Sequence, residues 1–219
     1  MNDNKTAAVA PAIAPAGLLG RATRFPLVCA LFLVIGLFAA GPRQAAAQDP
    51  RAFVAELGHQ AIQVLGRNVP SAQRIARFRE LFHDDFDVSG IGQFVLGRYW
   101  RVATPAEQQE FLRLFQEYIV QSYATRLAEY GGEPFRVLGT RASGNETVVS
   151  SEIDRPDGSR VLVDWYLLER GGAPKISDVY VGGVSMKVTE RDEFAAVIQR
   201  NGGRVDALLA QLRHRLQAF

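Results

Sequence analysis

Apolar and polar residues alternate in four successive segments between Pro134 and Gly183, and short turn sequences separate these segments. Alternation with a period of two is typical of β-strands that bury one face. It predicts strands at residues 135–140, 147–153, 160–168 and 175–181. The connecting segments are rich in glycine, asparagine and aspartate, which suit tight turns. Strands joined so closely pair antiparallel, so the sequence predicts a four-stranded meander.

Helical periodicity precedes and follows this sheet. Apolar residues at spacings of three and four predict four helices before the sheet. The first runs from residue 49 to about residue 65, the second begins after Pro70, the third covers residues 88–96, and the fourth runs from Thr104 to Gly131-Gly132. Thr104 and Glu107 have the spacing of a capping box. Two more helices are expected at residues 189–200, with Thr189 as its cap, and at 205–216. The sequence therefore predicts one α+β domain in which helices pack on a curved four-stranded antiparallel sheet.

The first 47 residues have the composition of a secretory signal peptide. Arg21 and Arg24 precede an apolar run over residues 25–40, and Ala45-Ala46-Ala47 offers small residues for cleavage. The run is shorter than the ~20 apolar residues that span a bilayer, although an uncleaved anchor remains the alternative. The single cysteine, Cys29, lies inside this run, so we expect an exported domain at residues 48–219 without disulfides.

The charge of the expected domain gives no indication of nucleic-acid binding. The chain has 25 basic and 23 acidic side chains, of which four basic and one acidic lie in the first 47 residues. The remaining 172 residues thus carry 21 basic and 22 acidic side chains. A nearly neutral domain lacks the basic surface that binds phosphate backbones, so we expect no nucleic-acid partner.

Motifs for cofactor, metal and nucleophile sites are incomplete. A phosphate-binding lysine loop and a dinucleotide fingerprint are both missing from the sequence, so we expect no cofactor. Asp85 and Asp87 resemble the start of a calcium loop, but Leu96 stands where that loop requires glutamate. A capping role at a helix C-terminus is the alternative to a metal site there. Residues 183–187 lack the second glycine of a nucleophile elbow and are interpreted as a turn.

The helix after Thr104 is apolar over more of its circumference than one contact requires. At ~100° per residue its apolar side chains cover an arc of about 220°, against a stripe of ≳100° for a typical surface helix. One face of the third predicted strand is also wholly apolar. Large side chains opposite small ones leave room for a cavity, although these features alone favour a well-packed core. The candidate lining residues, chosen by face, are Phe111, Phe115, Ile119, Tyr123, Val149, Ile153, Val163, Trp165, Leu167, Val181 and Met186.

Two arginines are candidates for the mouth of this pocket. Arg126 falls inside the apolar arc of the long helix, and Arg98 lies close to Trp100. Each either extends its charge to water along its methylene stem or meets an anionic group at the pocket. The sequence leaves both interpretations open.

Several motifs, in order along the chain, resemble those of the MlaC-type toluene-tolerance family. The first comprises residues 94–100 (FVLGRYW), 103–108 (ATPAEQ) and the aromatic series from Phe111 to Tyr123. The second comprises residues 176–186 (ISDVYVGGVSM) and continues through 191–194 (RDEF) to Gly203. Together they extend over residues 50–216. The resemblance implies an α+β domain of NTF2-like character with a deep apolar pocket for the acyl chains of a glycerophospholipid.

The resemblance also implies a function. It indicates a non-enzymatic, monomeric periplasmic carrier that exchanges diacyl phospholipid with an inner-membrane ABC transporter containing an MCE-type subunit and with an outer-membrane lipoprotein–porin complex. A branch of the family is associated with hopanoid biosynthesis, so a hopanoid or another apolar molecule is the alternative cargo. Gly131-Gly132 and Gly182-Gly183 are candidate hinges for opening the pocket. An enzyme with Asp164 or Asp178 as general base and an adaptor with a solid core are the hypotheses from other classes.

Overall fold

A computed structural model describes residues 48–65, 69–127 and 133–219 of the chain. The predicted signal peptide at residues 1–47, with Cys29, and the candidate hinge Gly131-Gly132 lie outside the described residues. Within the described ranges, none of the helices combines the length and the apolar composition needed to cross a membrane.

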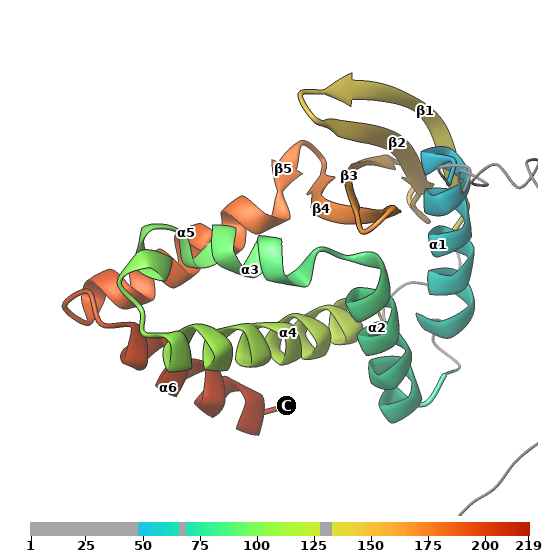
Figure 1. Cartoon of the computed structure of the whole chain (residues 1–219). Helices are drawn as coiled ribbons and strands as arrows, with labels where there is room; N and C mark the ends of the chain where they lie inside the picture. The colour runs from blue at the N-terminus through green and yellow to red at the C-terminus, as the bar shows by residue number, and fades with distance from the viewer. Residues whose placement is uncertain (1–47, 66–68, 128–132) are drawn as a thin grey trace, which may run out of the picture. The chain divides into compact units, whose positions relative to one another are not determined.

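The described part of the chain contains an antiparallel meander with the strand order β1-β2-β3-β4-β5 (Figure 1). The strands are β1 Phe135–Ser143, β2 Glu146–Asp154, β3 Arg160–Arg170, β4 Ala173–Val181 and β5 Val184–Ser185. All four predicted strands are present, and pairing continues beyond their predicted ends up to the turns. Bulges interrupt the register between Val137 and Gly139 and between Tyr166 and Leu167, and bulges increase the local bend of a sheet.

The fifth strand was not predicted. Gly182 and Gly183 have φ angles of 58° and 83°, which only glycine adopts readily, and they form a two-residue hairpin turn. This turn brings Val184 opposite Val181 and Ser185 opposite Tyr180. Within residues 183–187, which the sequence indicates as a turn, Val184–Ser185 therefore form a short strand and α5 begins directly after it at Met186.

The helices occupy most of the predicted positions. They are α1 Pro50–Leu65, α2 Ser71–Asp85, α3 Val88–Leu96, the 3₁₀ helix η1 Gly97–Arg101, α4 Pro105–Leu127, α5 Met186–Arg200 and α6 Val205–Gln217. Figure 1 shows α4 running between α3 and α6, while α1 lies beside β1 and β2. The expected class, an α+β domain with helices packed on an antiparallel sheet, is confirmed, with five strands in place of four.

Two caps differ from the predictions. The Ser185 hydroxyl accepts a hydrogen bond from the Val188 N–H (3.1 Å), so α5 begins at Met186 and not at Thr189. The Thr189 hydroxyl instead donates to the Ser185 carbonyl oxygen (2.9 Å) inside the first turn. Asp87 accepts from the Gly90 N–H (3.1 Å) and caps the N-terminus of α3, whereas the sequence indicated a helix C-terminus.

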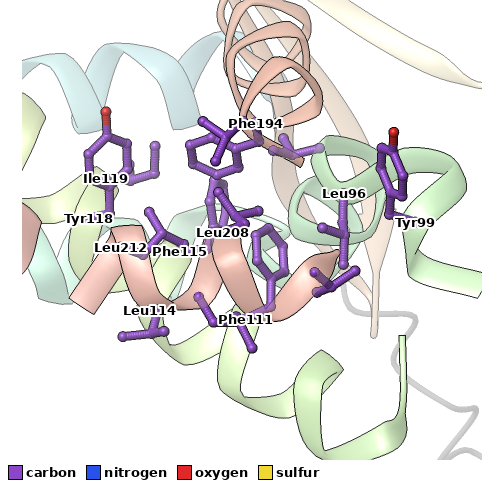
Figure 2. Packing of buried hydrophobic residues seen from close by; sticks show 14 of the residues in the cluster. Leu96, Tyr99, Phe111, Leu114, Phe115, Tyr118, Ile119, Phe194, Leu208 and Leu212 are labelled. Carbon is purple, nitrogen blue, oxygen red and sulfur yellow. The ribbon is translucent and has the colours of Figure 1, made fainter. Parts of the chain in front are cut away.

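Buried apolar side chains form two clusters within the described residues. The larger one joins α3, α4, α5 and α6, and Figure 2 shows Phe111, Phe115 and Phe194 at its centre. The ring of Phe194 meets those of Phe111 and Phe115 edge to face at centroid distances of 6.1 and 6.3 Å. The smaller cluster packs Phe53, Val54 and Leu57 of α1 on Val149, Leu167 and Ile176 of the sheet. The helix α1 therefore covers only part of the apolar sheet face.

Candidate functional site

A cavity of about 620 Å³ lies between the uncovered part of the sheet face and helices α2, α3, α4 and α5. An engineered cavity of ~150 Å³ already accepts one benzene ring, so this space suits a ligand with on the order of two dozen carbon atoms. Its apolar lining comprises Phe78, Phe82, Phe86, Ile91, Val95, Phe115, Ile119, Tyr123, Ile153, Pro156, Val161, Val163, Trp165, Val179, Val181 and Met186. Its charged lining comprises Arg126, Glu133, Asp154, Arg155, Asp178, Lys187 and Glu190.

The structure brings eight of the eleven predicted lining residues to the cavity. They are Phe115, Ile119 and Tyr123 of α4, Ile153, Val163, Trp165 and Val181 of the sheet, and Met186 of α5. Phe115 and Ile119 also belong to the larger buried cluster, so α4 forms the boundary between solid packing and open space.

Three predicted lining residues lie elsewhere. Phe111 is fully buried in the larger cluster, one turn of α4 before the cavity begins. Val149 and Leu167 share the sheet face with the cavity wall but lie beneath α1 in the smaller cluster. The alternation along a strand identifies the buried face, but it does not indicate which helix covers each part of that face.

Sequence reasoning did not assign α2 and α3 to the cavity. Phe78 and Phe82 of α2 and the following Phe86 form an aromatic series, with successive ring centroids 6.3 and 4.9 Å apart. Ile91 and Val95 of α3 complete this wall. The i, i+4 spacing of the three phenylalanines is the sequence signal for a continuous aromatic face, although it does not distinguish a cavity wall from a core.

The sheet side of the cavity presents apolar surface because its polar atoms bond within the wall. The Trp165 indole N–H donates to the Ser151 hydroxyl (2.9 Å), and that hydroxyl donates to the Val163 carbonyl oxygen (3.1 Å). Phe135 meets the Trp165 ring edge to face at 6.5 Å. The ring surface of Trp165 is thereby held in place without leaving an unpaired N–H toward the ligand space.

Arg126 lies where the cavity opens. Its side chain is exposed and lines the cavity, as do Arg155 and Pro156 in the turn between β2 and β3. The Arg126 guanidinium lies 5.3 Å from the centroid of the Tyr123 ring, which fits a cation–π contact. Arg98 donates to the Tyr99 hydroxyl (2.8 Å) and is not among the lining residues.

Glu190 is an acidic side chain within the apolar wall. It is only 7% exposed, and the Tyr123 hydroxyl donates to its Oε1 atom at 3.4 Å. Burial, followed by the nearby charge of Glu193, raises the pKa of Glu190 to about 7. Burial and the neighbouring Glu190 charge raise the pKa of Tyr123 to about 12. Near neutral pH the two groups therefore share the site with at most one negative charge.

The candidate general bases of the enzyme hypothesis have structural partners. Asp178 lines the cavity but accepts hydrogen bonds from the Ser185 hydroxyl (2.5 Å) and from the Val179 and Lys187 N–H groups (2.8 and 3.1 Å). These bonds tie β4 to the start of α5. Asp164 is not among the lining residues and accepts from the Ser150 hydroxyl (2.6 Å) and the Arg141 guanidinium (3.1 Å). Neither carboxylate is arranged to take a proton from a ligand in the cavity.

A metal centre has no support in the described part of the chain. Within residues 48–65, 69–127 and 133–219, three or more histidine, cysteine, aspartate or glutamate side chains do not come together in an arrangement that holds a metal ion. Asp87, the second carboxylate of the calcium-loop pattern, is used by the cap of α3 and by a contact with Arg170 at 3.3 Å.

Comparisons with known proteins point to one family. The family model described as MlaC protein matches residues 56–214. The toluene tolerance protein ttg2D of Pseudomonas putida is 31% identical over 122 residues, which are 55% of this chain and 57% of that protein. The intermembrane phospholipid transport system binding protein MlaC of Haemophilus influenzae is 21% identical over 127 residues, which are 56% of this chain and 58% of that protein. The chain thus matches little more than half the length of these curated relatives.

A solved structure has the same fold. A phospholipid-binding protein from Ralstonia solanacearum, solved in complex with a phospholipid, superposes with a TM-score of 0.69 at 23% sequence identity. The match covers 78% of this chain and 98% of that one. None of these three descriptions names an enzyme, in agreement with the surroundings of Asp164 and Asp178. Because the family model covers well over half of its length, the chain belongs to the MlaC protein family.

Proposed function

We propose that the chain is a non-enzymatic periplasmic carrier of diacyl phospholipid that holds the acyl chains in the cavity between sheet and helices. The observation that carries this proposal is the largely apolar space of about 620 Å³, whose lining includes the exposed residues Arg126 and Arg155. Transfer of two chains of ~14 methylenes each into water costs about 0.8 kcal/mol per methylene, or on the order of 20 kcal/mol. An apolar cavity that accepts the chains removes most of this barrier to leaving a membrane.

The headgroup is proposed to stay at the opening, next to Arg126. A guanidinium there suits a phosphate, because charge-assisted hydrogen bonds to phosphate are strong and tolerate partial exposure to water. Acyl chains supply most of the binding energy and carry little directional information, so several headgroup classes are expected to bind. The eight predicted residues that line the cavity, from Phe115 to Met186, are the proposed acyl-chain contacts.

The place of this carrier in the cell is part of the proposal. Residues 1–47 are the proposed removable signal peptide, which leaves residues 48–219 as a periplasmic monomer. The description of the Haemophilus influenzae relative as part of an intermembrane phospholipid transport system supports transfer between the two membranes. The proposed partners are an inner-membrane ABC transporter with an MCE-type subunit and an outer-membrane lipoprotein–porin complex. The named relatives offer no support for a hopanoid as cargo.

Mass analysis of the bound ligand tests this function directly. The full chain is expressed in a Gram-negative host, recovered from the periplasm and examined intact by native mass spectrometry. We expect an added mass equal to one diacyl phospholipid and, after extraction, phospholipids of more than one headgroup class. A ligand-free protein, or one that carries only a polycyclic mass, contradicts the proposal.

A further inference from the structure

Three cavity side chains form a polar series that leads inward from the opening. Arg126 is exposed, its guanidinium lies over the ring of Tyr123 at 5.3 Å, and the Tyr123 hydroxyl reaches Glu190 Oε1 at 3.4 Å. Tyr123 and Arg126 stand at positions i and i+3 of α4, a rise of about 4.5 Å along the helix axis. Nearby on the same helices, Ile119 of α4 and Met186 and Lys187 of α5 also line the cavity.

One of the two carboxyl oxygens of Glu190 makes no hydrogen bond within the described residues. This atom, Oε2, is buried, although Glu190 lines the cavity. A buried polar atom without a partner is unfavourable, and a ligand atom of matching chemistry relieves that cost. The side chain is more than nine-tenths buried, so bulk water does not provide the partner.

The groups around Glu190 act on its pKa in both directions. From α4 it meets the Tyr123 hydroxyl and the charge of Arg126, and from α6 the charge of Arg215. The Arg215 guanidinium is already engaged with the Tyr118 hydroxyl at 2.9 Å. On α5 itself, Glu193 adds a like charge. From β4, Asp178 faces the same cavity, but its carboxylate is held by Ser185 and two backbone N–H groups.

Burial and the like charge of Glu193 outweigh the Tyr123 hydrogen bond and the two arginines, so the pKa of Glu190 rises to about 7. Below neutral pH, for example at pH 6, the carboxyl is therefore largely protonated and has one O–H to donate. Since Oε1 accepts from Tyr123, the unpartnered Oε2 is the oxygen that carries this proton and still lacks an acceptor for it.

We propose that Glu190, supported by Tyr123, is a specificity-determining residue that donates a hydrogen bond to an acyl ester carbonyl of the bound phospholipid. The inference rests on the proposed function. In a diacyl phospholipid the ester carbonyls are the acceptors between the phosphate and the hydrocarbon. Only a few bonds separate them from the phosphate, which suits the single helical step from Arg126 at the opening to Tyr123 and Glu190 further in.

The site therefore distinguishes ester-linked from ether-linked lipids. A dialkyl ether lipid has the same chains and headgroup but no carbonyl oxygen, so it leaves Oε2 without its partner. One hydrogen bond of this kind corresponds to about a tenfold preference for the diester lipid. The preference is expected at pH 6 and is expected to fall toward unity at pH 8.5, where an ionised Glu190 has no proton to donate.

The experiment is a competition read by native mass spectrometry. Lipid-free wild-type protein is mixed with equal amounts of a diester phosphatidylcholine and its dialkyl ether analogue with the same chain length. Glu190→Gln keeps an N–H donor and is expected to retain the preference at both pH values. Glu190→Leu is expected to abolish it, and Tyr123→Phe to reduce it. Asp192→Asn, an exposed change on the same helix, is the matched control and is expected to behave as wild type.

The outcomes separate this inference from the proposed function. Binding of neither lipid overturns the proposed function and the inference with it. Equal binding of both lipids by the wild type at pH 6 overturns the inference alone, as does a preference that survives in folded Glu190→Leu. If Glu190→Leu does not fold, the pH dependence of the wild type and its absence in Glu190→Gln decide the question.

Discussion

Glu190 links the chemistry of the cavity to the stability of the fold. In the folded protein its pKa is about 7, whereas an ordinary glutamate titrates near 4.5. Between these values the folded state holds a proton that the unfolded chain has lost. The free energy of unfolding of the lipid-free protein is therefore expected to decrease by about 3 kcal/mol as the pH rises from 4.5 to 7, and this contribution is constant above that range.

Urea denaturation at pH 5 and pH 8 measures this effect. The wild-type free energy of unfolding is expected to be lower at pH 8 than at pH 5. Glu190→Gln has no carboxyl to titrate, so for this variant the decrease is expected to be smaller by about 3 kcal/mol. An identical pH dependence in the two proteins would show that Glu190 is ionised in the folded state at pH 5 and would remove the argument for a protonated carboxyl.

A signal for Glu190 exists in the sequence, but it is local and ambiguous. Met186, Glu190 and Phe194 follow one another at intervals of four, so a glutamate stands in the middle of an apolar stripe of α5. The structure buries Phe194 almost completely and brings Met186 to the cavity, which leaves Glu190 between core and cavity. The spacing does not reveal that one carboxyl oxygen has no partner, because that depends on side chains from α4 and α6.

At the scale of elements, Ser185 joins the sheet to α5. Its hydroxyl accepts from the Val188 N–H and donates to Asp178 Oδ2 at 2.5 Å, so one side chain caps the helix and satisfies a buried carboxylate. Ser185→Ala is expected to lower the free energy of unfolding by about 1–2 kcal/mol, because it removes a cap and a charge-assisted hydrogen bond. Urea denaturation of the purified variant provides the measurement.

Thr189→Ala is the matched control for this change. Thr189 is the cap that the sequence pattern favours, but in the structure it lies one turn inside α5. Loss of its hydroxyl is expected to cost about 0.5 kcal/mol or less, since alanine has the higher helix propensity. A larger loss for Thr189→Ala than for Ser185→Ala would mean that the helix begins where the sequence pattern indicates.

The contrast between two helix starts explains how much of the fold the sequence predicts. The box at Thr104 is complete within four residues: Glu107 Oε2 accepts from the Thr104 N–H at 2.8 Å, and the Thr104 hydroxyl accepts from the Glu107 N–H at 3.3 Å. Such a local signal is readable from sequence. The start of α5 depends on the Gly182-Gly183 hairpin and on Asp178 from β4. Contacts between residues this far apart in sequence cannot be recognised from the spacing of neighbouring residues.

At the scale of the whole domain, the cavity follows from incomplete coverage of one sheet face. Cross-strand pairs such as Val149 with Trp165 and Ile153 with Val161 show that a single apolar face extends along β2 and β3. Helix α1 covers this face at Val149 and Leu167, while Ile153 and Val161 line the open space. The sequence predicted the face and the excess apolar surface of α4, but the division between core and cavity depends on where α1 lies. The solid-core alternative is wrong for this structure.

A side chain that fills the cavity tests whether this space holds the lipid. Val163 lines the cavity from the central part of β3, and its neighbour Leu162 is 56% exposed on the opposite face of the same strand. Val163→Trp places an indole ring in the space for acyl chains, so we expect a clear loss of bound phospholipid in native mass spectra. Leu162→Trp adds the same ring outside the cavity and is expected to keep wild-type occupancy.

Stability separates a blocked cavity from a damaged fold. Extra volume destabilises a close-packed core by about 1–3 kcal/mol, but the ring in Val163→Trp enters a space of about 620 Å³. The lipid-free variant is therefore expected to unfold at a urea concentration equal to or above that of lipid-free wild type, since the ring buries apolar surface that water otherwise reaches. If Val163→Trp remains folded and still carries a full complement of diacyl phospholipid, the acyl chains lie outside this cavity and the carrier needs another binding surface.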